Sequence, residues 1–389
     1  MKNIFKYGSY FNYSMLNGLY YFGFGIFSCI ISIYLAGVGF NATEISLVAS
    51  ASPLFAMVFQ PLCGFLADYF KSPKLVTIFT LILTIICGLL FAYTKNLILL
   101  FLFNGLTQGF LNGVLTLTDR ICLGAPYAYG SIRLWGSLAW AFAAQIGGII
   151  LQYFSPILIF YIFAISLLLT IILCFFVKDV KIVEKHEKSI SLQLVLKKLW
   201  QNKTFVLFTL IFLIFQGPAA ANSVYLPLLI QEVGGSTTIV GTSLLLSTLF
   251  EIPTILYSDR VVKKISYKNL MLFATMLSFI RYAWYASIPS STMIVAMFFF
   301  QGLTTIIFIL IQVKIIIEIV EPQFVNSAYG ISSMLGRGVA ALVFQLCSGI
   351  IIDCFSGITG FTVVYGIMSI MMLLCLVLIT KFKFMPYNQ

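Results

Sequence analysis

Apolar residues fall in long runs, separated by short polar stretches, over the whole 389-residue chain. A membrane-spanning helix needs about 20 consecutive apolar residues to cross a hydrocarbon core of about 30 Å. The runs meet this length repeatedly, and they predict an all-α membrane protein with twelve transmembrane helices. We expect these helices near residues 10–36, 43–67, 75–93, 97–121, 131–153, 156–177, 205–230, 238–258, 269–287, 292–319, 328–351 and 359–380.

The composition supports the same class of protein. The chain is 61% hydrophobic and 9% charged, with a mean hydropathy of +1.05. Such values are typical of a polytopic membrane protein whose main partner is the lipid bilayer. The N-terminal stretch leads into the first apolar run without a small-residue cleavage site, so we expect an uncleaved first helix.

Basic residues predict the orientation, because Lys and Arg near helix ends mark the cytoplasmic side. Every second loop is basic, from Lys2 and Lys6 before the first run to Lys381 after the last, whereas the opposite loops contain only Lys95. We therefore expect a multi-pass protein of the plasma (inner) membrane with both termini in the cytoplasm. Membrane topology explains the net charge of +11, and no nucleic-acid partner is expected.

Internal repeats predict two similar halves. Phe59 and Phe250 each precede an Asp by nine residues near the end of the second and eighth runs. Ala128-Tyr129-Gly130 recurs 200 residues later as Ala328-Tyr329-Gly330. This is the pattern of two pseudo-symmetric six-helix halves related by an axis along the membrane normal. We expect an N-terminal half over 1–177, a cytoplasmic central loop over 178–204 and a C-terminal half over 205–389.

Within the central loop, Leu192, Val195, Leu196 and Leu199 follow helical spacing beside Lys197 and Lys198. The spacing fits a short amphipathic helix on the anionic inner leaflet. A solvated linker is the alternative interpretation.

Charged residues inside apolar runs are the main functional candidates. Asp119 and Arg133 lie seven positions on either side of residue 126, in a Gly-Ala-Pro turn, so antiparallel helices would place them facing each other at one depth. Each buried charge costs about 2.5–3.5 kcal/mol in a spanning helix, so an intramembrane pair indicates a functional site by default. A structural or interfacial salt bridge is the alternative.

A second pair of charges, Glu251 and Arg281, is centred on residue 266 in a basic loop. Both should lie about 22 Å of helix from the bend, near the middle of the membrane. A polar or water-filled cavity is needed to keep charges there, although a purely structural ion pair is the alternative. Arg337 lies deep in the eleventh run, opposite the uncharged Ser137 in the repeat, and is a further cavity candidate.

Catalysis is not expected. The single histidine, His186, lies in the central loop, and the eight cysteines show no metal-ligand spacing, so we expect no enzyme, cofactor or metal site. The chain has no Gly-rich loop ending in Gly-Lys-Ser/Thr, which leaves an ion gradient as the expected source of energy.

The stretch Gly64-Phe65-Leu66-Ala67-Asp68, with Lys71 and Lys74 after it, resembles the signature between helices two and three of the major facilitator superfamily. The resemblance covers essentially the whole chain and implies a transporter. In the family this motif is a charge lock that holds the cytoplasmic side in one state. It implies a gating role for Gly64, Asp68, Lys71 and Lys74, and more weakly for Asp259.

Within that superfamily, Phe59-Gln60-Pro61-Leu62 and the stretch from Tyr129 to Ser137 resemble the branch of lactose permease and phenylpropionate permease. The resemblance implies that Asp119 and Arg133 bind solute hydroxyls and that Trp140, two turns from Arg133 on one helix face, stacks on a ring. It further implies that Glu251 is linked to the substrate and that Arg281 takes part in proton coupling.

One departure from that branch changes the expected coupling. Gln301 and Thr304 stand where lactose permease has a His and a Glu, so the histidine step of that permease cannot operate. Desolvation disfavours the ionised form of an acid in an apolar cavity. Glu251 is therefore the leading proton carrier, with Asp119 second.

Together these features predict a monomeric secondary transporter, a proton-coupled symporter that imports a small polar solute such as a sugar, glycoside or nucleoside-like molecule. Asp119, Arg133, Trp140 and Arg337 are the expected substrate-binding residues. The alternatives are uptake of an aromatic or other carboxylate, with Arg133 and Arg337 as anion partners, then efflux of amphipathic compounds, then a non-transporting membrane sensor.

Overall fold

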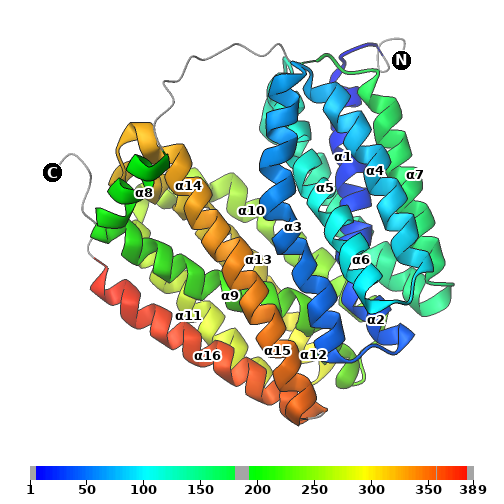
Figure 1. Cartoon of the computed structure of the whole chain (residues 1–389). Coiled ribbons are helices and arrows are strands. Elements are labelled where there is room, and N and C mark those ends of the chain that lie inside the picture. The colour runs from blue at the N-terminus through cyan, green and yellow to red at the C-terminus, as the bar shows by residue number, and fades with distance from the viewer. Residues whose placement is uncertain (1–5, 180–191, 356, 383–389) are drawn as a thin grey trace. The chain divides into compact units, whose positions relative to one another are not determined.

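The computed structural model describes residues 6–179, 192–355 and 357–382, and over these residues it is all-helical, without a strand (Figure 1). The chain divides into two compact units, of which the first comprises 1–184 with 234–249 and the second 185–233 with 250–389. The predicted division at residues 178–204 stays a prediction, and each unit is described by itself.

Over its described residues, the first unit contains seven helices and the first part of an eighth. Turns of a few residues join the long helices, and α1 continues into α2 after a break at Cys29 and Ile30. The helices are α1 (Tyr10–Ser28), α2 (Ile31–Val38), α3 (Ala42–Tyr69), α4 (Pro73–Tyr93), α5 (Leu97–Leu123), α6 (Tyr129–Tyr153), α7 (Ile157–Cys174) and the beginning of α10 (Thr237–Lys264).

The second unit contains the remaining helices and a wide-turn segment. This π segment, Met334–Ala340, is continuous with the helices on either side of it. The helices are α8 (Leu192–Gln201), α9 (Lys203–Glu232), the rest of α10, α11 (Tyr267–Ala286), α12 (Ser291–Ala296), α13 (Phe298–Ile319), a 3₁₀ turn (Pro322–Phe324), α14 (Val325–Ser333), α15 (Ala341–Phe355) and α16 (Ile358–Lys381).

Side-chain caps explain where several helices begin. Asn41 and Glu44 form a reciprocal capping box at the start of α3, and Ser72 caps α4 ahead of Pro73 at its first position. Asn96 accepts two backbone N–H groups at the start of α5. Gly39, at φ +102°, ends α2 in a left-handed conformation that glycine adopts without strain.

Glycines allow close packing of helices inside the first unit. Gly105, Gly109 and Gly113 of α5 lie directly against Phe55, Phe59 and Cys63 of α3, and a Cβ at any of the three glycines would come within 3.0 Å of a side-chain atom. Small residues at four-residue spacing let membrane helices approach each other closely. This packing places the end of α5 beside the end of α3.

The first part of α10 packs on the last turns of α6. Gly148 of α6 and Gly241 of α10 face each other, and the Thr237 hydroxyl donates to the Gly148 carbonyl at 2.8 Å. The Thr238 backbone N–H donates to Gln152 Oε1 at 3.1 Å. The two backbones therefore touch without an intervening side chain.

Nine helical segments, counted over the described residues alone, are long and apolar enough to cross a membrane. Helices occupy all the predicted ranges, but three predicted spans are interrupted. The first is broken at Cys29 and Ile30, the tenth at Met297, and the eleventh contains the π segment. The predicted count of twelve spans stays a prediction.

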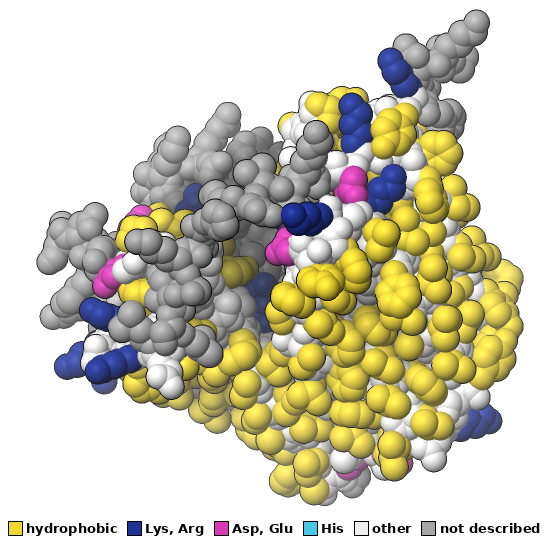
Figure 2. Space-filling model, turned by 45° about the horizontal axis from the view of Figure 1, so that its top comes forward, with side chains coloured by type: hydrophobic (Ala, Val, Ile, Leu, Met, Phe, Trp, Pro, Cys, Tyr) yellow, Lys and Arg dark blue, Asp and Glu magenta, His cyan; other side chains and the backbone are white. Residues whose placement is uncertain are grey.

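The surface agrees with a lipid environment. Figure 2 shows a broad hydrophobic flank with charged side chains gathered towards its ends. Phe65, Phe79 and Ile98 are among many large apolar side chains that stay exposed. A soluble monomer rarely exposes so much contiguous apolar surface.

The predicted helix in the central loop is confirmed as α8, which spans Leu192–Gln201. Val195 and Leu199 are buried, whereas Lys197, Lys198 and Trp200 are exposed. The helix is therefore amphipathic, and its predicted place on the inner leaflet stays a prediction.

Candidate functional site

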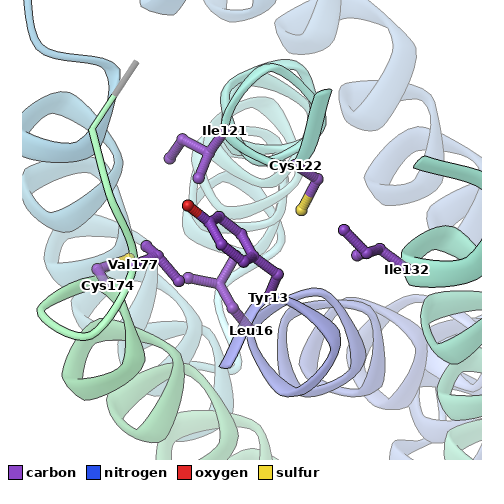
Figure 3. Packing of buried hydrophobic residues seen from close by; sticks show 7 residues of the cluster. All are labelled: Tyr13, Leu16, Ile121, Cys122, Ile132, Cys174 and Val177. Carbon is purple, nitrogen blue, oxygen red and sulfur yellow. The ribbon is translucent and has the colours of Figure 1, made fainter. Parts of the chain in front are cut away.

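A buried apolar cluster holds the ends of the helices that carry Asp119 and Arg133. The cluster joins α1, α5, α6 and α7, and its side chains point towards one another (Figure 3). Tyr13 lies at its centre, where its hydroxyl accepts the Lys178 backbone N–H at 3.2 Å. The cluster consists of Tyr13, Leu16, Ile121, Cys122, Ile132, Cys174 and Val177.

Asp119 lies four residues before the end of α5 and Arg133 four residues after the start of α6, so the two residues are at equal depth, as predicted. The Arg133 guanidinium lies 4.0 Å from the centroid of the Tyr21 ring, and the Tyr129 hydroxyl lies near the Asp119 carboxylate. Over the described residues no salt bridge joins Asp119 to Arg133. Arg133 acts on the Asp119 carboxylate through its charge, without direct contact between the two groups.

Several polar atoms around this pair are buried without a hydrogen-bond partner in the described part of the chain. They are Asp119 Oδ1, Arg133 Nη1, Asn17 Oδ1 and the Tyr21 hydroxyl. An unsatisfied buried polar group costs about 1–3 kcal/mol. Such a group of donors and acceptors is suited to a polar ligand that supplies the missing partners.

Gly136 is the close-approach position that brings α1 and α6 together here. A Cβ at this glycine would overlap Asn17 Oδ1 and would lie 2.6 Å from the Tyr21 ring and 3.1 Å from Arg133 Nη1. Any larger residue would therefore displace the side chains that surround Arg133.

Trp140 stands two turns along α6 from Arg133, as predicted. Its ring meets Phe24 of α1 edge to face, with centroids 5.1 Å apart, and its backbone packs against Gly25. The side chain is only partly buried. Trp140 thus presents a partly accessible indole, held in place by α1.

At the predicted gating motif, Asp68 pairs with a residue that the sequence analysis did not single out. Arg120 Nη1 donates to Asp68 Oδ1 at 2.7 Å, and both side chains are partly exposed. Lys71 adopts φ +53°, a left-handed conformation that turns the chain sharply after α3. Lys74 Nζ donates to the Val177 carbonyl at 3.2 Å, and a Cβ at Gly64 would meet open space.

The second unit contains a cavity of about 320 Å³. Its walls come from α9, α11, α13 and the π segment, and they combine two arginines with three amide side chains. The lining residues are Gln216, Ala219, Ala220, Asn222, Ser223, Arg281, Gln301 and Arg337. Two predicted site residues, Arg281 and Arg337, are therefore brought together.

Arg281 is almost completely buried, with 3% of its surface exposed. Its Nη2 donates to the Tyr282 hydroxyl at 3.3 Å, whereas Nε and Nη1 have no partner among the described residues. Arg337 is exposed, and its Nη2 donates to Gln312 Oε1 at 3.2 Å. Gln312 was not predicted, although an amide inside an apolar run is a visible signal.

Glu251 lies in α10, 13 residues before its end, and Arg281 lies 14 residues after the start of α11. These distances from the turn differ by one residue, and the predicted common depth of the two charges stays a prediction. The Glu251 side chain is partly exposed. The side chain of Asp259 lies outside the described residues.

These features define a helical membrane protein with polar, partly unsatisfied sites in each unit. Its arrangement is similar to that of solved transporters. The nucleoside transporter NupG aligns with a TM-score of 0.82 at 18% identity, covering 98% of this chain and 99% of that one. A D-xylose–proton symporter aligns with a TM-score of 0.71 at 14% identity, covering 97% of both chains.

The family model "MFS_1 like family" matches residues 13–363, and the chain belongs to this family of the major facilitator superfamily. The maltose permease of Geobacillus stearothermophilus is 26% identical over 93% of this chain and 92% of that protein. The uncharacterized transporter YwbF of Bacillus subtilis (strain 168) is 26% identical over 92% of this chain and 91% of that protein. The chain is thus a multi-pass membrane transporter and not an enzyme, which confirms the predicted superfamily.

Proposed function

We propose that this transporter is a proton-coupled symporter that imports a small polar solute, a sugar, glycoside or nucleoside-like molecule, by alternating access. In this proposal a monomer crosses the plasma (inner) membrane twelve times, as two six-helix halves with both termini in the cytoplasm. Protons and the solute are its partners, and it needs no cofactor.

The group of unsatisfied polar atoms around Arg133 carries the proposal. Asp119 Oδ1 and Asn17 Oδ1 can each accept a hydrogen bond from a solute, and Arg133 Nη1 can donate one. The Tyr21 hydroxyl can do either. A solute with several hydroxyl groups offers matching donors and acceptors on one small molecule. Trp140 supplies an aromatic face two turns away, where a sugar or base ring would stack.

The relatives support a sugar-like solute. Maltose permease matches nearly the whole chain, and the raffinose permease of Escherichia coli matches 40% of it at 26% identity. In the proposal Glu251 carries the proton, because an acid in a desolvated site exchanges between its neutral and ionised forms when a nearby charge moves. Arg281 is that charge, and Asp68 with Lys71 and Lys74 controls the gate.

Uptake into proteoliposomes tests the proposed binding residues. Labelled sugars, nucleosides and aromatic acids are screened with an imposed inward proton gradient, and the accumulated solute is then measured in variants. We expect Trp140→Ala to lower uptake at least tenfold and Trp140→Phe to keep part of it, because the phenyl ring retains an aromatic face. The matched control is Trp135→Ala, which removes an exposed indole from the same helix.

Normal uptake in Trp140→Ala would contradict the proposed stacking site. A panel in which no sugar or nucleoside crosses the bilayer would contradict the proposed solute class.

A further inference from the structure

We propose that the cavity of the second unit is an oxyanion subsite, which binds the carboxylate or phosphate group of the transported solute through Arg281 and Arg337. This inference rests on the proposed transport function and narrows the solute to an acidic sugar or glycoside. The subsite lies entirely within one unit.

The side chains that line the cavity give it a positive charge. Two guanidinium groups line about 320 Å³, and none of the lining residues that the structure describes is acidic. Burial of a cation is costly unless a counter-charge offsets the desolvation. An anion bound in the cavity would supply a counter-charge to the buried Arg281 and to Arg337 at once.

Arg281 has hydrogen-bond donors that a bound anion could use. The side chain is 3% exposed and lines the cavity, and its Nε and Nη1 lack a partner among the described residues. A guanidinium has two bidentate edges, Nε with Nη2 and Nη1 with Nη2, and each edge can bind a carboxylate or phosphate. The Tyr282 hydroxyl takes one of the two Nη2 hydrogens, so one complete edge keeps both of its donors.

Neighbouring polar side chains hold Arg337 in place at the cavity. It lies in the π segment Met334–Ala340, and π turns inside α-helices are frequently found at functional sites. Gln312 donates from Nε2 to the Ser332 and Ser333 hydroxyls at 2.9 and 3.0 Å, which directs its Oε1 at Arg337 Nη2. One donor of Arg337 is thereby fixed, and four of the five on a guanidinium remain.

The amide groups complete the subsite. Asn222 Nδ2 donates to Gln301 Oε1 at 3.2 Å, while Asn222 Oδ1 is buried without a partner in the described chain. The volume is at the small end of the range of about 300–1,000 Å³ for ligand pockets. A single acidic sugar residue is of suitable size, with its anion on the arginines and its hydroxyls on the amides.

Anion binding to the purified, full-length protein tests this inference without knowledge of the solute. Thermal unfolding in neutral detergent is followed during titration with sodium acetate or inorganic phosphate, with chloride added to keep the ionic strength constant. We expect a saturable rise of the unfolding temperature, because a ligand that binds only the folded state stabilises it. Acetate reports on carboxylate binding, and phosphate on phosphate binding.

The variants assign the effect to the two arginines. We expect Arg337→Gln to raise the half-saturating anion concentration at least tenfold, and Arg337→Lys to recover part of the affinity, because lysine keeps the charge but not the fork. Arg281→Gln should have the same effect. The matched control is Lys314→Gln, which removes a cation of α13 that does not line the cavity, and it should bind anions as the wild type does.

The inference is overturned if neither anion gives a saturable shift in the wild type, or if Arg337→Gln binds as well as the wild type. It is also overturned if phosphatidylglycerol added to the micelles gives an Arg337-dependent shift that the soluble anions do not. Uptake of neutral sugars without anion binding would contradict the oxyanion subsite but not the proposed transport function. Anion binding without any solute flux would contradict the transport function but not the subsite.

Discussion

Gly241→Ala is the change that most directly tests the packing of α10 on α6. A Cβ at Gly241 would lie 2.7 Å from the Ala144 carbonyl oxygen and 3.0 Å from the Gln145 Cα. Both atoms belong to the α6 backbone, which cannot turn aside as a side chain can. The two helices must therefore separate to accept a single methyl group.

The size of the effect follows from these distances. Ordinary contact begins at 3.4 Å, so the 2.7 Å contact is 0.7 Å too short. Overpacking of this kind costs about 1–3 kcal/mol. At about 1.4 kcal/mol per factor of ten, the equilibrium should move about 5- to 140-fold away from the state in which α6 and α10 touch.

Disulfide cross-linking measures this equilibrium. Gln152 and Thr238 are replaced by cysteine, because the Thr238 N–H and Gln152 Oε1 are 3.1 Å apart. A protease site between residues 184 and 188 then reports the cross-link, since cleaved fragments stay together only when the disulfide has formed. We expect Gly241→Ala to slow its formation about 5- to 140-fold, in proportion to the lost population.

Gly130→Ala is the matched control, because a Cβ at Gly130, also in α6, would have nothing within 4 Å. It should cross-link at the wild-type rate. An equal rate in Gly241→Ala and Gly130→Ala would refute the close backbone contact and the cost derived from it.

Two further predictions concern arginines of the first unit. Arg133→Lys should weaken solute binding about 2- to 30-fold, because it removes the stacking of the guanidinium on Tyr21, an interaction worth about 0.5–2 kcal/mol. If uptake by the wild type and the variant is half-saturated at the same solute concentration, this stacking does not contribute to binding. Arg120→Gln should change the free energy of unfolding by only about 0.2–1 kcal/mol, since its ion pair with Asp68 is 35% and 60% exposed. Thermal unfolding in detergent measures this, and loss of the folded protein would show that the pair is structural.

The sequence alone predicted the positions of the helices well, because a spanning helix needs a long apolar run and short loops leave little freedom in its bounds. Interruptions inside those runs were missed. Met297 breaks the predicted tenth span, and the π segment widens the eleventh. Neither contains a proline, and Gly336 and Gly338 in the π segment are too common in membrane helices to mark an irregular turn. Such breaks depend on packing between helices that are distant in sequence.

The candidate site was predicted in part. Equal depth of Asp119 and Arg133 follows from the turn between two helices, and the structure has it. Their actual partners, Tyr129 and Tyr21, depend on how α1 packs on α6, which periodicity does not give. Arg120 was missed because a charge at a helix end is common and carries no signal until Asp68 is placed beside it.

Proton-driven accumulation tests the central proposal most directly. Proteoliposomes with an imposed inward proton gradient are compared for the wild type and Glu251→Gln, with the solute that the screen identifies. We predict that the wild type accumulates the solute against its gradient, and that Glu251→Gln still exchanges the solute but does not accumulate it. Simple equilibration by the wild type, or normal accumulation by the variant, would contradict proton symport through Glu251.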